Sequence, residues 1–220
     1  FAITQAIAMG AYIGFHYGDV APAEYESLIT KIQLNGTVLS ICSFATLIVC
    51  SSLVLCIVKL KKNSSIKHYL GLHTVSLNDI GFWSLVTIAF IFVSDLLTFL
   101  LGKPVVPEFM SAVYTSTESL WFLWLALIVA APLFEELFFR GFLISGLKSS
   151  FVRPVGAVLI SSALWAAIHL QYDLYGMLTV FVIGLMLGMA RIKTDSVLLT
   201  VGMHSFMNLV ATIETAIHVS

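Results

Sequence analysis

The chain has 220 residues, of which 59% are hydrophobic and only 10% are charged, and its mean hydropathy is +1.00. A soluble domain carries about 25% charged residues, so 11 Lys and Arg with 12 Asp and Glu cannot cover the surface of a water-soluble globule. The sequence therefore predicts an all-α protein that crosses a membrane several times. A formal net charge of -1 provides no basic face for nucleic acid, and that class of partner is excluded.

Seven stretches are apolar over roughly the 20 residues that a membrane-spanning helix needs. In chain order they are residues 1–15, 38–58, 80–102, 119–147, 154–170, 174–190 and 196–217. The first is short, and we expect it to be part of a longer span. No repeat or long linker separates the stretches, so residues 1–220 are expected to form a single integral membrane domain, a bundle of about seven helices. Gly184 and Gly188 form a GlyxxxGly pattern that predicts close packing of the sixth stretch against another helix.

The distribution of Lys and Arg predicts orientation, because these residues are retained on the cytoplasmic side of a membrane. The loops after the second, fourth and sixth stretches carry eight of them: Lys59, Lys61, Lys62, Lys67, Lys148, Arg153, Arg191 and Lys193. The alternate loops carry only Lys31 and Lys103. We therefore expect the first loop and the C-terminus to face outside. The compact chain favours the plasma membrane of a bacterium or archaeon.

The fourth stretch contains three charged residues, Glu135, Glu136 and Arg140, in the segment Ala-Pro-Leu-Phe-Glu-Glu-Leu-Phe-Phe-Arg-Gly. Charge at membrane depth is costly and by default marks a functional site. Glu136 and Arg140 are an i,i+4 pair on one helix face, whereas Glu135 is turned about 100° away. We expect the arginine to neutralise one glutamate and to leave the other for chemistry. A simple buried ion pair with a protonated carboxyl is the alternative, and Pro132 is a candidate break in the helix.

Two later stretches each carry a pair of polar or aromatic residues with i,i+4 spacing. Trp165 and His169 share a face of the fifth stretch, and His204 and Asn208 share a face of the last. A single His or Asn inside a membrane is more often a hydrogen-bonded packing residue than a catalyst. The pairs carry more weight together, because a hairpin centred near residue 151 brings position 135 opposite about position 167.

Glu135 and His169 are therefore expected to face each other. A carboxylate and an imidazole that share a water molecule form a general base without a metal. His204 and Asn208 could then hold the oxygen of a carbonyl group while negative charge develops on it, an effect that is strong in a water-poor cavity. This arrangement predicts hydrolysis of a peptide bond within the membrane.

The motifs resemble those of the CPBP family of intramembrane endopeptidases, which includes type II CAAX proteases and bacteriocin-processing enzymes and is also called the Abi family. The family pattern EExxxR is present at residues 135–140, FxxxH at residues 165–169 with Trp165 in place of Phe, and HxxxN at residues 204–208. The resemblance covers residues 119–212, which would form the catalytic core. The residues before this core carry no family signature.

The resemblance implies a glutamate-dependent protease that needs no cofactor. Glu135 and His169 would activate the water, and His204 with Asn208 would form the oxyanion site. These roles agree with those argued from the spacing of the residues.

Three further residues would support this site. Glu136 and Arg140 would stabilise the arrangement, and Trp165 would shape the substrate cleft. Zinc remains an alternative, because two His and two Glu can supply the three nitrogen or oxygen ligands of a catalytic zinc site. The HExxH pattern of many zinc proteases is absent, so no metal is expected.

The expected partners are membrane lipid and a membrane-associated peptide or protein substrate, and the oligomeric state stays open. The predicted orientation places Glu135 about 24 Å of helix from the cytoplasmic loop near residue 151. A site nearer the outer face favours a membrane-borne precursor, such as a bacteriocin or pheromone leader, over a prenylated cytosolic substrate. Two other classes remain: a non-catalytic membrane scaffold or bacteriocin immunity protein with the same fold, and a proton-relaying transporter.

Overall fold

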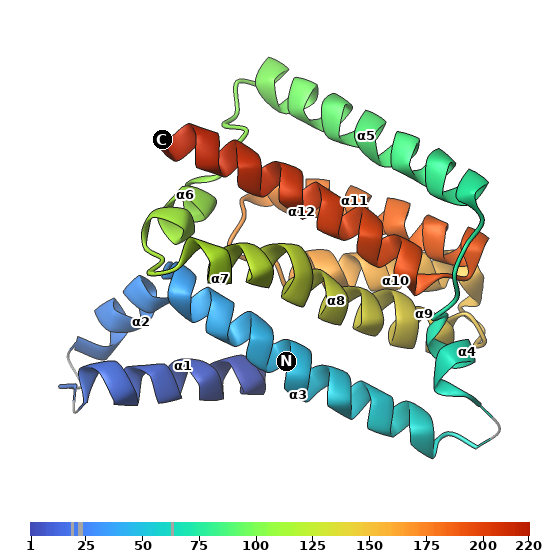
Figure 1. The fold of residues 1–220 in the computed structure, drawn as a ribbon, viewed down its shortest axis with the longest axis horizontal. Coiled ribbons are helices and arrows are strands. Elements are labelled where there is room, and N and C mark those ends of the chain that lie inside the picture. Colours follow the sequence, from blue (N-terminus) through green and yellow to red (C-terminus); the bar gives the residue numbers. More distant parts are fainter. Residues whose placement is uncertain (19, 22–23, 63) are drawn as a thin grey trace. The chain divides into compact units, whose positions relative to one another are not determined.

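The computed structural model describes residues 1–18, 20–21, 24–62 and 64–220, and this part of the chain is helical and contains no strand. The expected all-α class is therefore confirmed (Figure 1). In a membrane each backbone N–H and C=O needs a partner within its own segment, which is why long apolar runs become helices. The helices are α1 (Ala2–Tyr17), α2 (Tyr25–Gln33), α3 (Gly36–Leu60), α4 (Ile66–Leu70), α5 (Leu77–Leu100), α6 (Glu108–Thr115), α7 (Leu120–Leu125), η2 (Ala126–Ala130), α8 (Ala131–Glu135), η3 (Glu136–Leu143), α9 (Ile144–Leu147), α10 (Arg153–Ala167), α11 (Leu174–Thr194) and α12 (Val197–Val219).

Among the described residues, five helices are long and apolar enough to cross a membrane. They are Gly36–Leu60, Leu77–Leu100, Leu120–Leu147, Leu174–Thr194 and Val197–Val219. The expected count of about seven is not confirmed, although helices form at all seven stretches. The helix α1 has 16 residues and α10 has 15, fewer than the roughly 17 to 25 residues of a spanning helix. The five long helices support a multi-pass membrane protein.

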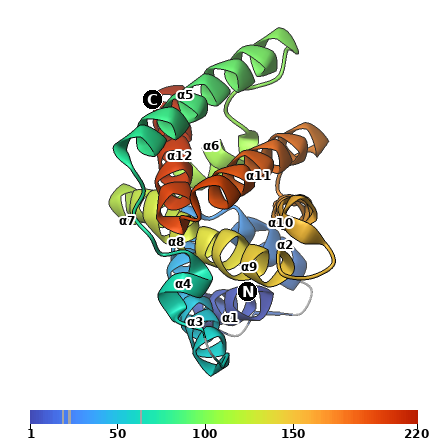
Figure 2. The same ribbon diagram turned by 90° about the vertical axis from the view of Figure 1, so that its right-hand side faces the viewer.

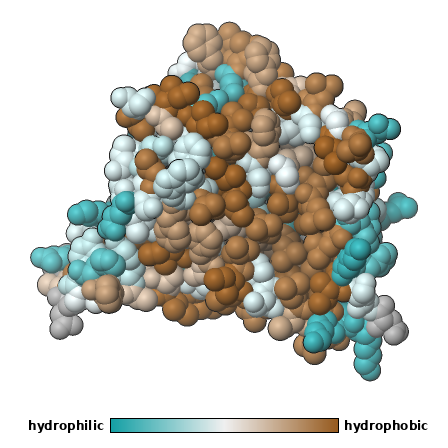
Figure 3. All heavy atoms as spheres, in the orientation of Figure 1, coloured by the Kyte–Doolittle hydropathy of each residue, from teal (hydrophilic) through white to brown (hydrophobic). Residues whose placement is uncertain are grey.

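The surface of the protein is consistent with lipid contact. Hydrophobic side chains predominate on the face shown in Figure 3, and hydrophilic ones gather where α3 ends and α4 begins. Apolar residues of α5 are widely exposed, for example Leu85 at 67% and Phe92 at 68%. Such exposure would be unfavourable in water and is favourable against lipid tails.

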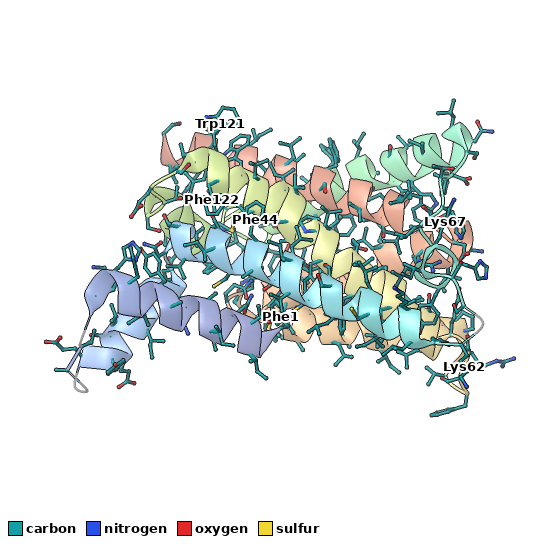
Figure 4. All side chains as sticks on the ribbon, turned by 60° about the horizontal axis from the view of Figure 1, so that its bottom comes forward. Phe1, Phe44, Lys62, Lys67, Trp121 and Phe122 are labelled. Atoms are coloured by element: carbon teal, nitrogen blue, oxygen red, sulfur yellow. The ribbon has the colours of Figure 1, made fainter. Side chains whose placement is uncertain are left out.

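The described residues cluster in two compact units, and several helices contribute to both. Unit 1 comprises Phe1–Ser52, Val106–Phe134 and Asn208–Ser220. One of its clusters contains Tyr12, Leu28, Ile32, Val38 and Cys42. Elsewhere in this unit the rings of Phe44 and Phe122, labelled in Figure 4, stack with centroids 5.1 Å apart. The single integral domain expected over residues 1–220 stays a prediction.

Unit 2 comprises Leu53–Val105 and Glu135–Met207, and it contains most of the residues singled out in the sequence. In this unit α11 lies beside α10 (Figure 2). A Cβ atom on Gly184 would lie 2.8 Å from Ser162 Cβ, and one on Gly188 would lie 2.7 Å from Val158 Cγ1. Only glycine permits this approach, so the close packing predicted from the GlyxxxGly pattern is confirmed.

Candidate active site

The spanning helix Leu120–Leu147 changes its hydrogen-bond register along its length. The segments η2 and η3 are π-helical, and the N–H of Ile144 accordingly bonds to the carbonyl of Phe139, five residues back. Such segments are rare and frequently occur at functional sites, because they redirect the side chains that they carry. Residues 136–143 hold both Glu136 and Arg140. Pro132 does not break the helix, contrary to the expectation, because the surrounding segments continue without interruption.

The predicted pair of Glu136 and Arg140 is present and fully buried, with both side chains 0% exposed. Arg140 Nη1 donates to Glu136 Oε1 at 2.9 Å. His204 Nδ1 lies 3.0 Å from the same oxygen, so this carboxylate joins α12 to the spanning helix Leu120–Leu147. A buried carboxylate is tolerated when it has such partners.

Arg140 makes two more contacts within unit 2. Its Nη2 donates to the carbonyl oxygen of Gly184 at 3.4 Å, and its Cζ lies 4.3 Å from the centre of the Trp165 ring. The second contact is a cation–π interaction. Glu136 Oε2 and Arg140 Nε are buried without a hydrogen-bond partner in the described part of the chain. Unpaired buried polar atoms are rare in proteins, so this ionic group is only partly satisfied by the residues around it.

Trp165 lies at the centre of the predicted site residues. Its Nε1 donates to Glu135 Oε2 at 2.5 Å, and its side chain is nearly inaccessible. Its ring meets His169 edge-on with centroids 5.2 Å apart, and it meets His204 in the same manner at 5.2 Å. Glu135 and His169 therefore contact the same indole, and the structure gives no direct bond between them. Trp165 does more than shape the cleft, because it holds one of the two glutamates.

The geometry of His169 fixes which ring nitrogen is available. His169 Nδ1 lies 2.7 Å from the backbone oxygen of Trp165, and a carbonyl oxygen only accepts hydrogen bonds. The proton of a neutral His169 therefore sits on Nδ1, which leaves Nε2 as a base. Glu135 and His169 are both partly exposed, whereas Glu136 and Arg140 are buried. The accessible pair is thus the one predicted to activate water.

Asn208 belongs to unit 1, where its Nδ2 donates to the carbonyl oxygen of Leu127 at 2.8 Å. The N–H of Ala131 bonds to the carbonyl of Ala126, five residues back, and the next acceptor in that register is Leu127. The next donor would be Pro132, which has no N–H. Asn208 therefore satisfies the carbonyl that the proline leaves free. Its predicted role in an oxyanion site stays a prediction.

Arg191 is a buried residue that the sequence interpretation placed among the cytoplasmic loop charges. It lies in α11 with its side chain 0% exposed. Its Nε donates to the carbonyl oxygen of Arg140 at 3.1 Å, its Nη2 donates to Ser145 Oγ at 3.2 Å, and its Nη1 binds the Asp195 carboxylate. Arg191 thereby holds the π-helical segment from the side of α11. The i,i+4 spacing of Arg191 and Asp195 was the available signal for this residue.

Burial and the neighbouring positive charges shift the pKa of Asp195 in opposite directions. Burial raises the pKa of this carboxyl, but the hydrogen bonds and positive charges of Arg191 and Lys148 outweigh burial and lower its pKa below the usual value. Lys148 Nζ lies 3.2 Å from Asp195 Oδ1. The carboxylate therefore stays ionised and remains a partner for the buried arginine at neutral pH.

No cluster of three or more His, Cys, Asp and Glu side chains that could hold a metal ion occurs within the described ranges. Glu136 Oε1 is already shared between Arg140 and His204. The expectation that the protein needs no metal stays a prediction.

The family match covers the C-terminal half of the chain. Residues 117–210 match the family described as type II CAAX prenyl endopeptidase Rce1-like, which confirms the resemblance drawn from the three motifs. An uncharacterized 24.3 kDa protein of Escherichia coli is 34% identical over an alignment of 114 residues, and the alignment covers 48% of this chain and 52% of the relative. The chain thus covers about half the length of that relative. No solved structure matches.

Proposed function

We propose that this protein is a membrane-embedded endopeptidase of the CAAX type that hydrolyses a peptide bond in a membrane-associated protein or peptide precursor. The observation that supports the proposal is the arrangement of accessible and buried polar residues around Trp165. The accessible Glu135 and His169 contact one indole, and the buried Glu136, Arg140 and His204 form an ionic group behind it. The match of residues 117–210 to a family of CAAX endopeptidases supports the same reaction.

In the proposed reaction, Glu135 and His169 Nε2 take a proton from a water molecule. The water oxygen attacks the carbonyl carbon of the scissile bond, and the carbonyl oxygen becomes an oxyanion. The bond between that carbon and the amide nitrogen then breaks. The proton taken from the water passes to the leaving nitrogen, so the products are a carboxylic acid and an amine, which exchange the second water proton to give a carboxylate and an ammonium group. The bond from Trp165 to Glu135 orients the carboxylate for this transfer.

The oxyanion would be stabilised from α12. With Nδ1 bound to Glu136, His204 has Nε2 left to face the substrate. Nε2 donates a hydrogen bond only when His204 is protonated, and the Glu136 carboxylate is the counter-ion that this form requires. Asn208 Nδ2 uses one of its two hydrogens for Leu127, and its second hydrogen would complete the oxyanion site.

The test is cleavage of a library of membrane-anchored peptides by the detergent-purified protein. We expect Glu135→Gln to abolish cleavage without changing the unfolding temperature, because the amide keeps the shape of the side chain but is not a base. Glu108→Gln, which alters an exposed glutamate of α6, is the matched control and should cleave as the wild type does.

The same assay with a strong chelator separates two mechanisms. Cleavage that survives the chelator but is lost in Glu135→Gln supports the glutamate-dependent mechanism, and cleavage lost with the chelator points to zinc. Two results together would contradict the catalytic proposal: the purified wild type cleaves no peptide, and cells that carry Glu135→Gln keep the wild-type phenotype. These results would support the non-catalytic scaffold.

A further inference from the structure

Unit 2 contains an open cavity of about 600 Å³ on the side of α12 that faces α5. Residues of α5, of the segment before it and of the first half of α12 line this cavity. They are His73, Thr74, Val75, Ile80, Ser84, Thr87, Ile88, Ser196, Leu198, Leu199, Gly202, Met203 and Phe206. We call this cavity the α5–α12 groove. Its volume lies within the range of about 300 to 1,000 Å³ that small-molecule sites occupy.

The lining of the groove suits a hydrocarbon chain. Most of its side chains are apolar, and two of its hydroxyls are already bonded. Ser196 Oγ donates to the backbone oxygen of His73, and Thr87 Oγ1 donates to that of Trp83 at 2.8 Å. Leu199 and Met203 form part of the buried cluster that also contains Trp165. An apolar chain in the groove would therefore displace no hydrogen bond of these groups.

Basic side chains lie beside one end of the groove. His73 lines the groove, and its ring centroid lies 6.0 Å from that of His68. Lys67 and His68 are exposed on α4. The sequence carries no Asp or Glu between Glu26 and Asp79. From the end of α3 to the groove residue His73 the chain carries the basic residues Lys59, Lys61, Lys62, Lys67, His68 and His73, and Figure 4 labels two of them, Lys62 and Lys67.

We propose that the α5–α12 groove binds one hydrocarbon chain of an anionic phospholipid, whose phosphate lies against Lys67, His68 and His73. An apolar groove that ends in a basic segment complements a molecule with an apolar tail and an anionic head. Clusters of four or more basic residues next to a spanning helix attract anionic lipid headgroups. This proposal does not depend on the proposed protease activity.

The groove can be filled without disturbing the fold. A Cβ atom on Gly202 would meet no atom within 4 Å, so Gly202→Leu should place its side chain in the open groove. Gly81→Leu is the matched control, because a Cβ on Gly81 also meets nothing within 4 Å and Gly81 does not line the groove. The two variants add the same side chain to exposed positions of spanning helices in the same unit.

The measurement is retention of lipid by the purified full chain after washing with detergent, followed by native mass spectrometry. The probes are phosphatidylglycerol and phosphatidylcholine with identical acyl chains. We expect one phosphatidylglycerol per wild-type chain. Gly202→Leu should weaken its binding about tenfold, which corresponds to two lost buried methylene groups, and Gly81→Leu should bind as the wild type does. Unchanged binding by Gly202→Leu would overturn the groove as the site.

The headgroup is tested with Lys67→Gln combined with His68→Gln. We expect the wild type to prefer phosphatidylglycerol over phosphatidylcholine about fivefold or more, and the double variant to lose most of this preference. Lys31→Gln, in unit 1, is the control for a general change in charge and should keep the preference. Equal retention of the two lipids by the wild type would overturn the proposal, because it would show that the groove holds any lipid chain.

Discussion

Two helical segments of unit 2 differ in how they are held. The segment η3 is fixed by polar contacts from three helices: His204 of α12, Arg191 of α11, and Ser161 of α10, whose Oγ donates to the carbonyl oxygen of Phe139 at 3.1 Å. The helix α5 is widely exposed and is held by polar contacts near its end, where the hydroxyls of Thr98 and Tyr175 lie 2.7 Å apart.

Polar contacts between helices thus fix η3, whereas most of the surface of α5 is left exposed to lipid. A π-helical segment leaves its backbone in an unusual register, and hydrogen bonds from neighbouring helices define the positions of the side chains that it carries. The helix α5 carries no residue of the predicted catalytic set and borders a groove instead.

The largest effect is expected for Arg140→Met. The substitution leaves the Glu136 carboxylate fully buried with His204 as its remaining partner, and loss of one member of a buried pair costs about 3 to 5 kcal/mol. The measurement is the free energy of unfolding in detergent. Arg153→Met, at an exposed position, serves as the control. A loss below about 1 kcal/mol would show that the buried pair does not hold η3.

A smaller loss of stability, about 2 to 3 kcal/mol, is expected for Arg191→Met. It leaves the carbonyl of Arg140 and the hydroxyl of Ser145 unsatisfied, whereas Asp195 is 47% exposed and can turn to water. The same unfolding measurement checks this value. Cleavage by Arg191→Met should also fall, because the π-helical segment loses its contact with α11. Stability equal to that of the wild type would contradict the anchoring role.

Trp165→Phe tests the centre of the site. The phenyl ring keeps an aromatic face over Arg140 but cannot donate to Glu135. We expect cleavage to fall about tenfold or more, because the carboxylate is no longer oriented. Stability should fall by about 1 to 2 kcal/mol, because the smaller ring leaves a cavity in the core, whereas water can replace the lost donor at the partly exposed Glu135. Trp121→Phe, at a position 83% exposed, is the control. Full activity would show that Trp165 does not orient the glutamate.

The smallest effect is expected for the ion pair of Lys103 and Asp173, which lies near the end of α5. Lys103 Nζ donates to Asp173 Oδ2 at 2.8 Å, and Asp173 also caps α11 by accepting from the N–H of Gly176. The hydrogen bond from Lys103, followed by the one from Gly176, lowers the pKa of Asp173. A lowered pKa stabilises the folded state above the unfolded value of about 3.9, and this contribution is lost as the pH falls through the folded pKa.

The unfolding temperature measured against pH checks this prediction. Lys103→Gln should be slightly less stable than the wild type at neutral pH, and the difference should begin to shrink below a pH of about 4 and vanish once the pH has fallen through the folded pKa of Asp173. Lys31→Gln, which removes a lysine from unit 1, should show no such pH-dependent difference. A difference that persists at low pH would assign the effect of Lys103 to packing rather than to charge.

Features that depend on local spacing were predicted well from the sequence. Apolar runs of sufficient length must become helices in a membrane, because an unpaired backbone group has no water to bind there. The pair of Glu136 and Arg140 was predicted from its i,i+4 spacing. The close packing of α11 against α10 at Gly184 and Gly188 was predicted because glycine has no side chain to keep the helices apart. Charge in an apolar run also pointed to the segment that carries the buried pair of Glu136 and Arg140.

Features that depend on contacts between distant segments were decided only by the tertiary structure. The sequence paired Glu135 with His169, but the structure joins both residues through Trp165. Arg191, taken as a loop charge, is buried against Arg140. The π-helical register was not predicted either, because it depends on which donors lie beside the helix. Local spacing fixes neighbours on one helix, whereas the partner of a buried polar group depends on how several helices pack.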